Sequence, residues 1–503
     1  MTDSANILSL FIASANRHLH KIALIQEDDS VSYDKLLNAV SSEAKHYSEK
    51  GIGKGDRVLV FVPVSIRLYV AVLALLSIGA TPVFIDEWVN VDRLKVCCQN
   101  VKCNAVIAPR KFLLLSWFIK ELRQISIRLS PKFCTAENAE IQLVNVTNND
   151  TALITFTTGS TGIPKAANRT HGYLHAQFNA LRHLVDNDAA SSLITLPIVT
   201  LINLALGKTT VLPGKGFAVK KSQTSAILVN DVRHNNVDEI ITSPAVLEDI
   251  TSLLSENDAV KKNIRYITTG GGSVHPEQAQ TILQNFVNAK STVVYGSTEA
   301  EPISEIDMAY LATVPAEDVI ANGLPVGIIN ACTELIILDA ADEVVDGSNL
   351  QSKILPIGEA GEIVVSGSHV LKSYINNIEA EKQNKIHVGD LVWHRTGDVG
   401  MIDQNRCLYL KGRVSESVEL NGKVHYPMLV TFALEYYAKT TGALLLHNGR
   451  PMLVIGSKVE NDTLEEVLTL LSLEGVIIKH VSRIPKDSRH RTKIDYEALR
   501  LLL

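Results

Sequence analysis

Blocks of apolar residues alternate with polar, glycine-containing turns along the first 110 residues. The pattern from Tyr33 to Lys50 predicts a helix, and the apolar run RVLVFVPV, after the turn GIGKGD, predicts a strand. The most apolar stretch, Leu68 to Ala80, follows; at 13 residues it is too short to span a bilayer and predicts a buried helix. The short strand TPVFID then completes a β-α-β unit, which predicts a parallel α/β sheet.

A similar alternation returns after Val185, in the segments SSLITLPIV, TTVLPG, VDEIITSPAVLEDITSLL, IRYITTGGG and STVVYGSTEA. From about Cys332 the strands TELIILD, GEIVVSG and CLYLKGR indicate a smaller β-rich subdomain. Strand signals stop at KGR, and the last 90 residues predict a compact α+β unit. We therefore expect an α/β fold with a large N-terminal domain, residues 1–412, made of α/β sheets and the β-rich subdomain, and a small α+β C-terminal domain, residues 413–503.

Composition and charge narrow the class of protein. The chain has 503 residues, of which 46% are apolar and 20% charged, and a net charge of −6. These values are ordinary for a globular enzyme and argue against a dedicated nucleic-acid binder. The cysteine cluster of Cys97, Cys98 and Cys103 has no CxxC pair, so reduced thiols are expected rather than zinc. With no basic region at the N-terminus, we expect no secretory signal, no integral membrane segment and a cytoplasmic location.

The segment TFTTGSTGIPKAANRTH follows the apolar run TALIT and concentrates glycines, hydroxyl residues and one lysine. It is not a P-loop, because Pro164 precedes Lys165 and Ala166 follows it, where a P-loop has glycine and a hydroxyl residue. Such a loop can still present backbone N–H groups and hydroxyls to anionic oxygens, although a flexible surface turn is the alternative. The residues alone do not place Arg169 toward phosphates or toward solvent.

Two further segments place glycines and polar residues after strand signals. In VVYGSTEAEP, Glu299 follows the end of a strand and can ligate Mg²⁺, which prefers carboxylate and phosphate oxygens; a solvated glutamate is the alternative. In ITTGGGSV, three consecutive glycines allow a flat ring or a phosphate to approach the backbone, although GxGxxG is absent and a tight turn is the alternative.

Two segments nearer the C-terminus carry charge. HRTGDVGMID is expected to place Asp398 in a glycine-bounded turn before a strand, where the carboxylate can accept ribose hydroxyls or satisfy N–H groups of the turn. RIPKDSRHRTKIDY is a basic loop. Pro485 and the apolar-acid-aromatic trio after Lys493 favour a placed lysine over a solvated basic tail.

The order and spacing of these segments resemble the adenylate-forming superfamily of acyl-CoA synthetases, luciferases and peptide-synthetase adenylation domains. That family's phosphate loop, roughly [FY]-[ST]-[ST]-G-[ST]-T-G-x-P-K, matches Phe156 to Lys165 throughout. Its YGxTE element matches Tyr295 to Glu299, its TGD element matches Thr396 to Asp398, and its GR before a hinge matches Gly412 and Arg413. The late catalytic lysine of the family fits Lys493, and the resemblance covers essentially the whole chain.

The C-terminal motif narrows the resemblance further. Arg489 and His490 precede Lys493-Ile494, which resembles the RHxxKI version found in a branch that includes olefin-pathway β-lactone synthetases. The segment from Leu196 to Gly207 also resembles that branch.

The resemblance implies that ATP and Mg²⁺ activate a carboxylic acid: the carboxylate attacks the α-phosphate, pyrophosphate leaves and an acyl-adenylate remains. The implied catalytic residues are Lys493, Thr298 at the α-phosphate and Glu299, which is also the implied Mg²⁺ ligand. The implied ATP-binding residues are Thr157, Thr158, Gly159, Ser160, Thr161, Gly162 and Lys165 for the phosphates, Gly270, Gly271, Gly272, Tyr295 and Gly296 around adenine, and Asp398 and Arg413 for the ribose.

In the family, the C-terminal module then rotates about the hinge, withdraws the lysine and admits a thiol of CoA or of a carrier protein. We expect the same of a mobile C-terminal domain here, with Gly422 near the thiol. Two departures concern this second half-reaction only: Ser415 stands where the family often has an Asp, and Glu419 lies where Lys or Arg is frequent.

The acyl pocket is expected from residues 196–206, 270–274 and 294–303, which contain no evident Lys, Arg or Asp for an amino-acid substrate. An apolar acid such as a fatty acid is therefore favoured, and His171 and His275 are expected in core or surface roles. The leading interpretation is an acid–thiol ligase that uses CoA or an acyl carrier protein. The alternatives are a β-lactone synthetase, which closes an adenylated β-hydroxy acid without a thiol, and a non-catalytic binding protein of the same fold.

Overall fold

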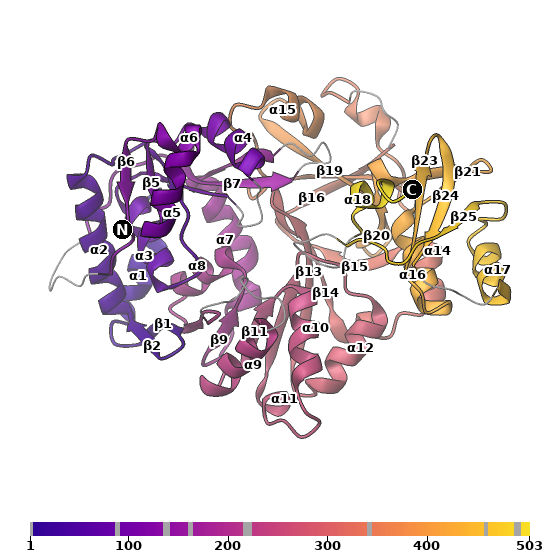
Figure 1. Cartoon of the computed structure of the whole chain (residues 1–503), viewed down its shortest axis with the longest axis horizontal. Helices are drawn as coiled ribbons and strands as arrows, with labels where there is room; N and C mark the ends of the chain where they lie inside the picture. The colour runs from indigo at the N-terminus through magenta and orange to yellow at the C-terminus, as the bar shows by residue number, and fades with distance from the viewer. Residues whose placement is uncertain are drawn as a thin grey trace.

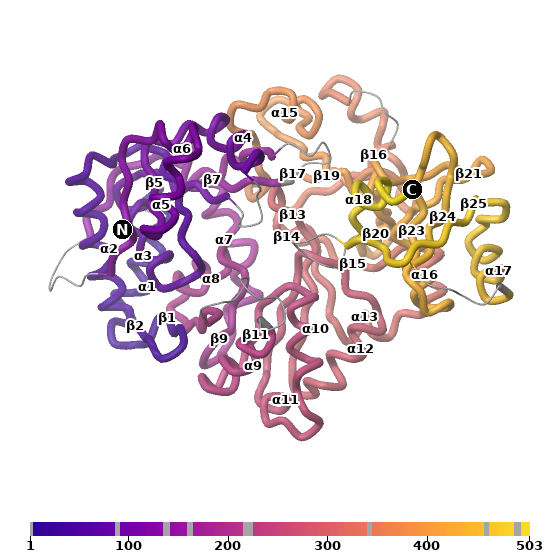
Figure 2. Tube along the Cα trace, viewed as in Figure 1, coloured from indigo at the N-terminus to yellow at the C-terminus, as the bar shows by residue number. Residues whose placement is uncertain are grey.

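The computed structural model describes residues 4–85, 91–133, 141–158, 164–214, 224–339, 345–456, 461–486 and 494–503. The N-terminal part of the chain lies on one side of the molecule and the C-terminal part on the other, with the orange and magenta segments between them (Figure 2). Among these residues, no helix combines the length and apolar character needed to cross a membrane.

The first sheet is the parallel α/β sheet predicted from the N-terminal pattern. As far as the structure describes the chain, it has six strands, in the order β6-β5-β3-β4-β7-β8, and only the β7–β8 pair is antiparallel. Their bounds are β3 (Arg57–Val60), β4 (Thr81–Phe84), β5 (Ala105–Ile107), β6 (Ile127–Leu129), β7 (Thr151–Thr158) and β8 (Pro164–Thr170).

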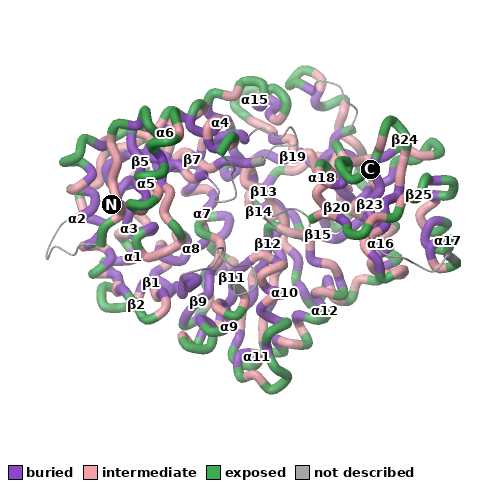
Figure 3. The backbone as a smooth tube through the Cα atoms, viewed as in Figure 1, coloured by how far each residue is buried: buried purple, intermediate pink, exposed green. Residues whose placement is uncertain are grey.

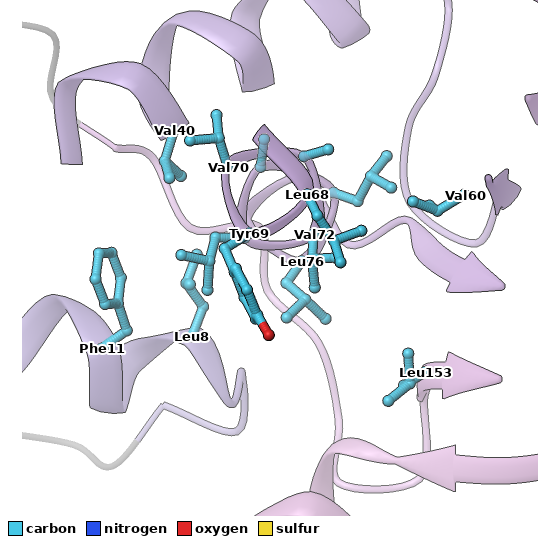
Figure 4. Packing of buried hydrophobic residues seen from close by; sticks show 14 of the residues in the cluster. Leu8, Phe11, Val40, Val60, Leu68, Tyr69, Val70, Val72, Leu76 and Leu153 are labelled. Carbon is cyan, nitrogen blue, oxygen red and sulfur yellow. The ribbon is translucent and has the colours of Figure 1, made fainter. Parts of the chain in front are cut away.

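The buried helix predicted over Leu68 to Ala80 is present as α3 (Ile66–Ser77), and ten of its twelve residues are buried. Its N-terminus is capped by Ser65, whose Oγ accepts a hydrogen bond from the Leu68 N–H at 3.3 Å. Side chains from neighbouring elements, including Leu8, Phe11 and Val40, surround it (Figure 4). Each such side chain contributes about 1.5–3 kcal/mol by leaving water, so α3 anchors the N-terminal core.

The second sheet carries the later α/β repeat in its parallel half. The strands follow the order β13-β12-β11-β9-β10-β1, all parallel, and β2 closes the edge antiparallel to β1. Their bounds are β1 (Ile22–Gln26), β2 (Asp29–Ser32), β9 (Ser192–Ile194), β10 (Thr210–Val211), β11 (Glu239–Thr242), β12 (Tyr266–Gly270) and β13 (Lys290–Ser297).

The β-rich part predicted from about Cys332 continues this same sheet. A hairpin turns β13 back as an antiparallel strand, and the remaining strands follow in the order β14-β15-β20-β19-β17-β16, with β18 beside β19. Their bounds are β14 (Ala300–Asp307), β15 (Leu324–Ile329), β16 (Glu334–Leu338), β17 (Gly361–Ser366), β18 (Lys385–Val388), β19 (Leu391–Ile402) and β20 (Cys407–Arg413).

Helices cover these sheets and connect their parallel strands (Figure 1). Those before residue 260 are α1 (Leu8–Arg17), α2 (Tyr33–Glu49), α3, α4 (Val91–Val101), α5 (Arg110–Leu115), α6 (Lys120–Arg123), α7 (His171–Val185), α8 (Pro197–Ala205), α9 (Thr224–His234) and α10 (Pro244–Leu253), with the 3₁₀ turn η1 (Ser116–Phe118). Later ones are α11 (Val260–Asn263), α12 (Pro276–Asn285), α13 (Met308–Leu311), α14 (Ala316–Asn322) and α15 (Ile378–Asn384), with η2 (Leu350–Lys353).

The C-terminal α+β part contains small sheets of its own. Strands β23 (Gly442–His447) and β24 (Arg450–Ile455) are antiparallel, and β25 (Ile477–His480) pairs with β24 in parallel. A separate core of residues from Val418 to Val476 lies beneath them. The remaining elements are η3 (Val414–Glu416), β21 (Val418–Leu420), β22 (Lys423–His425), α16 (Pro427–Tyr437), α17 (Asn461–Leu470) and α18 (Tyr496–Arg500).

The prediction of a glycine-bounded turn around Asp398 is wrong. Asp398 lies within strand β19 and pairs with Arg413 of β20. The glycines fit the strand because Gly397 adopts a φ of +72° and the register shifts between Val399 and Gly400. Glycine in a strand can therefore signal an irregularity rather than a turn.

A buried ion pair fixes the parallel half of the second sheet. The Lys208 Nζ lies 3.2 Å from the Glu239 Oε2, and the exposed fractions of the two side chains are 8% and 0%. The same carboxylate accepts a hydrogen bond from Asn187 at 2.6 Å, and Lys208 also donates to the Val185 carbonyl at 2.5 Å. Together these bonds join the end of α7 to β11.

We expect Lys208→Met to lower stability by ~3–5 kcal/mol, because it leaves the Glu239 carboxylate buried without its cation. A urea-unfolding midpoint measures the change. Lys439→Gln is the control, since Lys439 pairs with Glu277 at 3.7 Å with both side chains more than half exposed. Equal midpoints for Lys208→Met and the wild type would contradict the structural role of the pair.

Candidate active site

A cleft of about 3150 Å³ lies between the two large sheets and the C-terminal part of the chain. Most of the described residues that the sequence predicted for ATP and the metal line it, although their positions in the sequence span more than 250 residues. They are Thr157, Lys165, Gly271, Gly272, Tyr295, Gly296, Thr298, Glu299, Asp398 and Arg413. Gly270 instead lines a small apolar side pocket of about 30 Å³, which shares Leu196, Val199, Val294 and Glu301 with the cleft.

Glu299 joins three parts of the fold at one carboxylate. It sits in the two-residue turn between β13 and β14, and its Oε1 accepts hydrogen bonds from the Thr157 Oγ1 of β7 and from the Tyr374 hydroxyl, both at 3.1 Å. Its backbone carbonyl accepts the Leu371 N–H at 2.7 Å. The residues predicted as phosphate-binding and as metal-binding are therefore in direct contact.

The donors around Glu299 fit Mg²⁺ of the kind that is held by one carboxylate, substrate phosphates and water. One carboxylate and the hydroxyl of Thr157 face the same space, and no group of three or more His, Cys, Asp or Glu side chains suited to a metal occurs in the described parts of the chain. Glu299 therefore fits a metal that arrives with the nucleotide, and the described residues around it do not form an all-protein metal cage.

Two lysines flank the ring of Tyr374 beside Glu299. Lys165, on β8, lies 5.7 Å from the ring centre and donates to the Asn384 Oδ1 at 3.1 Å. Lys385 lies 5.4 Å from the same ring and donates to the Leu371 carbonyl. Burial lowers the pKa of Lys165 and lowers the pKa of Lys385 to about 7. Both ammonium groups are therefore placed where a polyphosphate would stabilise their charged forms.

Tyr374 and Lys385 were missed in the sequence. The only available signal was the aromatic and basic content of LKSYINN and NKIHV, which carries no chemistry at a fixed spacing.

Asp398, which also lines the cleft, is held by two partners. The Arg413 guanidinium forms a salt bridge with its Oδ1, and the Tyr295 hydroxyl donates to its Oδ2 at 2.7 Å. The charge of Asp398 raises the pKa of Arg413, and burial raises the pKa of Tyr295. The carboxylate predicted for the ribose is therefore adjacent to the tyrosine predicted for the adenine.

The glycines of ITTGGGSV combine close backbone packing with open space. A side chain at Gly270 would bring its Cβ to 2.8 Å from the Val294 carbonyl oxygen on the neighbouring strand. Gly271 has a φ of +83° and faces open space in the cleft. A flat group can therefore reach this backbone, as the sequence predicted.

Arg169 faces neither solvent nor the lysine pair. Its side chain is buried, its guanidinium lies 5.6 Å from the centre of the Tyr173 ring, and it donates to the Thr298 carbonyl at 3.1 Å. The Tyr173 hydroxyl donates to the same carbonyl at 3.4 Å. Arg169 thus fixes the turn that carries Thr298 and Glu299, and it also lines the cleft.

Glu301 is a second polar residue in the part of the cleft predicted to hold the acyl group. Its Oε2 lies 3.5 Å from the Gln177 Nε2 on α7, and burial raises its pKa. The ranges predicted for the acyl pocket contain no Lys, Arg or Asp, as stated, but they do contain the carboxylate of Glu301, and Arg169, whose orientation the sequence left open, lines the cleft from β8.

The two histidines considered for the acyl side lie in different surroundings. His171 is buried, its Nδ1 accepts the Ile7 N–H at 3.2 Å, and burial lowers its pKa to about 4. His275 lines the cleft and stacks on Phe432 of α16 with ring centres 4.9 Å apart. The contacts of His171 are those of a core residue.

Several predicted residues lie outside the described part of the chain: Gly159, Ser160, Thr161, Gly162 and Lys493. The side chain of Thr158 is likewise not described. Lys486 and Ile494, on either side of the segment with Lys493, pair with each other and line the cleft.

Comparisons with known proteins agree with this arrangement. A sequence profile of the AMP-binding enzyme family matches residues 11–375. An olefin β-lactone synthetase of Xanthomonas campestris is 27% identical over 94% of this chain and 90% of its own length. Another, of Stenotrophomonas maltophilia, is 28% identical over 78% of this chain and 74% of its own length.

Solved structures show the same fold. O-succinylbenzoate coenzyme A synthetase of Bacillus subtilis in complex with AMP superimposes with a TM-score of 0.77 at 19% identity, over 98% of both chains. The amide bond synthetase of Marinactinospora thermotolerans superimposes with a TM-score of 0.80 at 18% identity, over 99% of both chains. Together with the extent of the family match, these likenesses lead to one conclusion: this chain belongs to the AMP-binding enzyme family and is an adenylate-forming enzyme.

Proposed function

We propose that this enzyme adenylates an apolar carboxylic acid with a hydroxyl on its β-carbon and closes the product to a β-lactone. The observation that carries the proposal is Glu301, a half-buried carboxylate that lines both the cleft and a side pocket that is otherwise mostly apolar. A hydroxyl on the β-carbon would donate a hydrogen bond to this carboxylate, whose contact with Gln177 is long at 3.5 Å, whereas a plain fatty acid chain offers it no polar group. The names of the two β-lactone synthetases described above support the same choice.

In the first step we assign the neutralisation of charge to the lysines and the metal. Lys165 and Lys385 would bind the β- and γ-phosphates, with Thr157, Thr158 and residues 159–162 supplying hydroxyls and N–H groups. Mg²⁺ held by Glu299 would supply positive charge at the phosphates when bound. Lys493, on a C-terminal domain of residues 413–503 that acts as a lid, would stabilise the α-phosphate as the carboxylate displaces pyrophosphate.

Adenosine is assigned to the part of the cleft around Asp398. Asp398, oriented by Arg413 and Tyr295, would accept the ribose hydroxyls, and Gly271 and Gly272 would lie against the adenine beside Tyr295 and Gly296. Thr298 would contact the α-phosphate from the turn that Arg169 fixes.

In the second step the hydroxyl oxygen of the substrate attacks its own acyl carbon. A new C–O bond closes the four-membered ring, the C–O bond to AMP breaks, and AMP leaves with the electron pair. The hydroxyl proton must pass to a base. Glu301 suits this role because burial raises its pKa, which makes its carboxylate a stronger base than an exposed one.

The test is a screen of 3-hydroxy acids and matched unsubstituted acids with ATP and Mg²⁺, with and without CoA. We expect pyrophosphate and AMP release with 3-hydroxy acids, and a lactone product, without CoA. AMP release that requires CoA, with a thioester product, would instead establish an acid–thiol ligase.

Lys493→Ala should lose pyrophosphate release. Arg483→Ala is the control and should keep it, because Arg483 belongs to the same basic segment but is exposed and lies outside the cleft.

We expect the protein to take up a proton when it binds ATP at about pH 8. Burial lowers the pKa of Lys385 to about 7, so at pH 8 its side chain is mostly the neutral amine in the free protein. Nearby phosphates would raise that pKa again. At about pH 6 it is already protonated, so its uptake should vanish. Calorimetry in buffers of different ionisation enthalpy measures the uptake.

Lys385→Met should reduce the uptake at the higher pH. Lys411→Met is the control, because burial lowers the pKa of Lys411 as well but Lys411 does not line the cleft. An unchanged uptake in Lys385→Met would show that phosphates do not bind beside this lysine.

Glu301→Gln should separate the two steps. We expect pyrophosphate release to persist while lactone formation falls by about ten- to a hundredfold, because the amide cannot accept the hydroxyl proton. Glu305→Gln serves as the control: Glu305 is four residues further along β14 but bonds His183, 2.7 Å away, and does not line the cleft. If Glu301 had only a structural role, Glu301→Gln would lower the rates of pyrophosphate release and lactone formation together. The rate of lactone formation in the wild type would then not follow the titration of a carboxylate.

A further inference from the structure

The chain exposes four bulky apolar side chains next to one another at α5 and η1. None of the six residues of α5, with the sequence RKFLLL, is buried. Leu114, Leu115, Trp117 and Phe118 are 69%, 64%, 56% and 88% exposed. Single exposed apolar residues are common on proteins, but a contiguous group marks an interaction surface.

Basic residues surround this group. The segment from Arg110 to Arg128 contains five Lys or Arg residues and one Glu, in a chain whose net charge is −6. Lys111, Lys120 and Arg123 are exposed. We call the four apolar residues and these three cations the basic–apolar patch. Figure 3 draws much of the segment around α5 and α6 in the exposed colour.

The patch is ordered by its neighbours. The Arg128 guanidinium lies 4.8 Å from the centre of the Trp117 ring, and its Nη1 donates to the Ser116 Oγ at 2.6 Å. This packing holds the indole at the surface rather than letting it collapse into the core.

The patch also adjoins the cleft. Pro109 and Arg110, at the start of α5, line the cleft. Phe112 of α5 stacks on Phe61, another cleft residue, with ring centres 3.9 Å apart. A surface bound at the patch would therefore lie next to a rim of the active site.

We propose that the basic–apolar patch docks the enzyme on a bilayer surface rich in anionic lipid, with this rim of the cleft toward the membrane. Trp, Phe and Leu side chains beside Lys and Arg are the composition that binds the interface between headgroups and acyl chains. Contact between two copies of the patch would bring like charges together, and lysine is depleted in protein interfaces. The inference does not rest on the proposed lactone chemistry, because any apolar acid that partitions into a membrane would reach the cleft this way.

The experiment is co-sedimentation of the full-length protein with vesicles. Equal parts of phosphatidylcholine and phosphatidylglycerol should bind it at least about tenfold more tightly than phosphatidylcholine alone, and salt should weaken the binding. The double variant Trp117→Ser, Phe118→Ser and the triple variant Lys111→Gln, Lys120→Gln, Arg123→Gln should each weaken binding by about tenfold or more.

The control is the double variant Val287→Ser, Ile357→Ser, which removes apolar residues of 69% and 66% exposure elsewhere on the surface. It should bind vesicles as the wild type does. All variants should keep wild-type pyrophosphate release with a water-soluble acid, which shows that they fold and separates this test from that of the proposed function.

Equal binding to both kinds of vesicle, or equal loss in the control variant, would overturn the proposal. So would an absence of vesicle binding combined with patch-dependent, salt-sensitive binding to an acidic carrier protein, because the occupant would then be a protein.

Discussion

The carboxylate of Glu299 is the point at which the parts of this structure meet. Its Oε1 is bound at 3.1 Å by Thr157 from the first sheet and at the same distance by Tyr374, while Glu299 itself belongs to the turn of the β13–β14 hairpin in the second sheet. Neither sheet alone forms the site. A carboxylate that is partly withdrawn from water needs compensating donors or cations, and the chain supplies both to Glu299: two hydroxyls and, around the same tyrosine ring, Lys165 and Lys385. The catalytic geometry and the junction of the sheets are therefore the same set of bonds.

The sequence located the elements whose patterns are local. Helix α2 begins at Tyr33 as predicted and ends at Glu49, one residue early, because a one-sided apolar periodicity depends only on neighbours in the chain. Asp398 was misplaced in a turn because Gly397 and Gly400 resemble turn residues, whereas tertiary pairing with β20 makes them part of a strand. Tyr374 and Lys385 were missed, and the orientation of Arg169 was left open, for a related reason. Their partners lie far away in sequence, 75 residues for Tyr374 and Glu299 and 129 for Arg169 and Thr298, and no spacing rule reaches that far.

The family motifs identify the adenylating machinery, and the residues outside those motifs distinguish this chain. YGSTE supplies Thr298 and Glu299, but the next glutamate, Glu301, lies on the acyl side against Gln177 and is absent from the motif. Arg169 has a different contact, since it donates to the backbone of the turn that carries the motif. The charge of Arg169 also opposes the rise in the pKa of Glu301, so the two side chains are not independent. Glu301 is the better probe of which acid the enzyme accepts, because it lines the side pocket and Arg169 does not.

The charged residues of the cleft constrain how an apolar acid can enter. Lys165 and Lys385 lie beside the Tyr374 ring, and Asp398 is held by Arg413 and Tyr295. An apolar chain gains nothing beside these groups, because they attract charged or polar partners. The rim beside α5 differs: Phe61 and Phe112 stack there, and exposed Leu, Trp and Phe side chains continue the apolar surface outward. A long-chain acid is poorly soluble in water, and at this rim it would meet the Phe61–Phe112 stack, although Arg110 also lines the cleft there. The basic–apolar patch adjoins this rim, so the place where the enzyme is proposed to meet a membrane and the place where its substrate enters are expected to coincide.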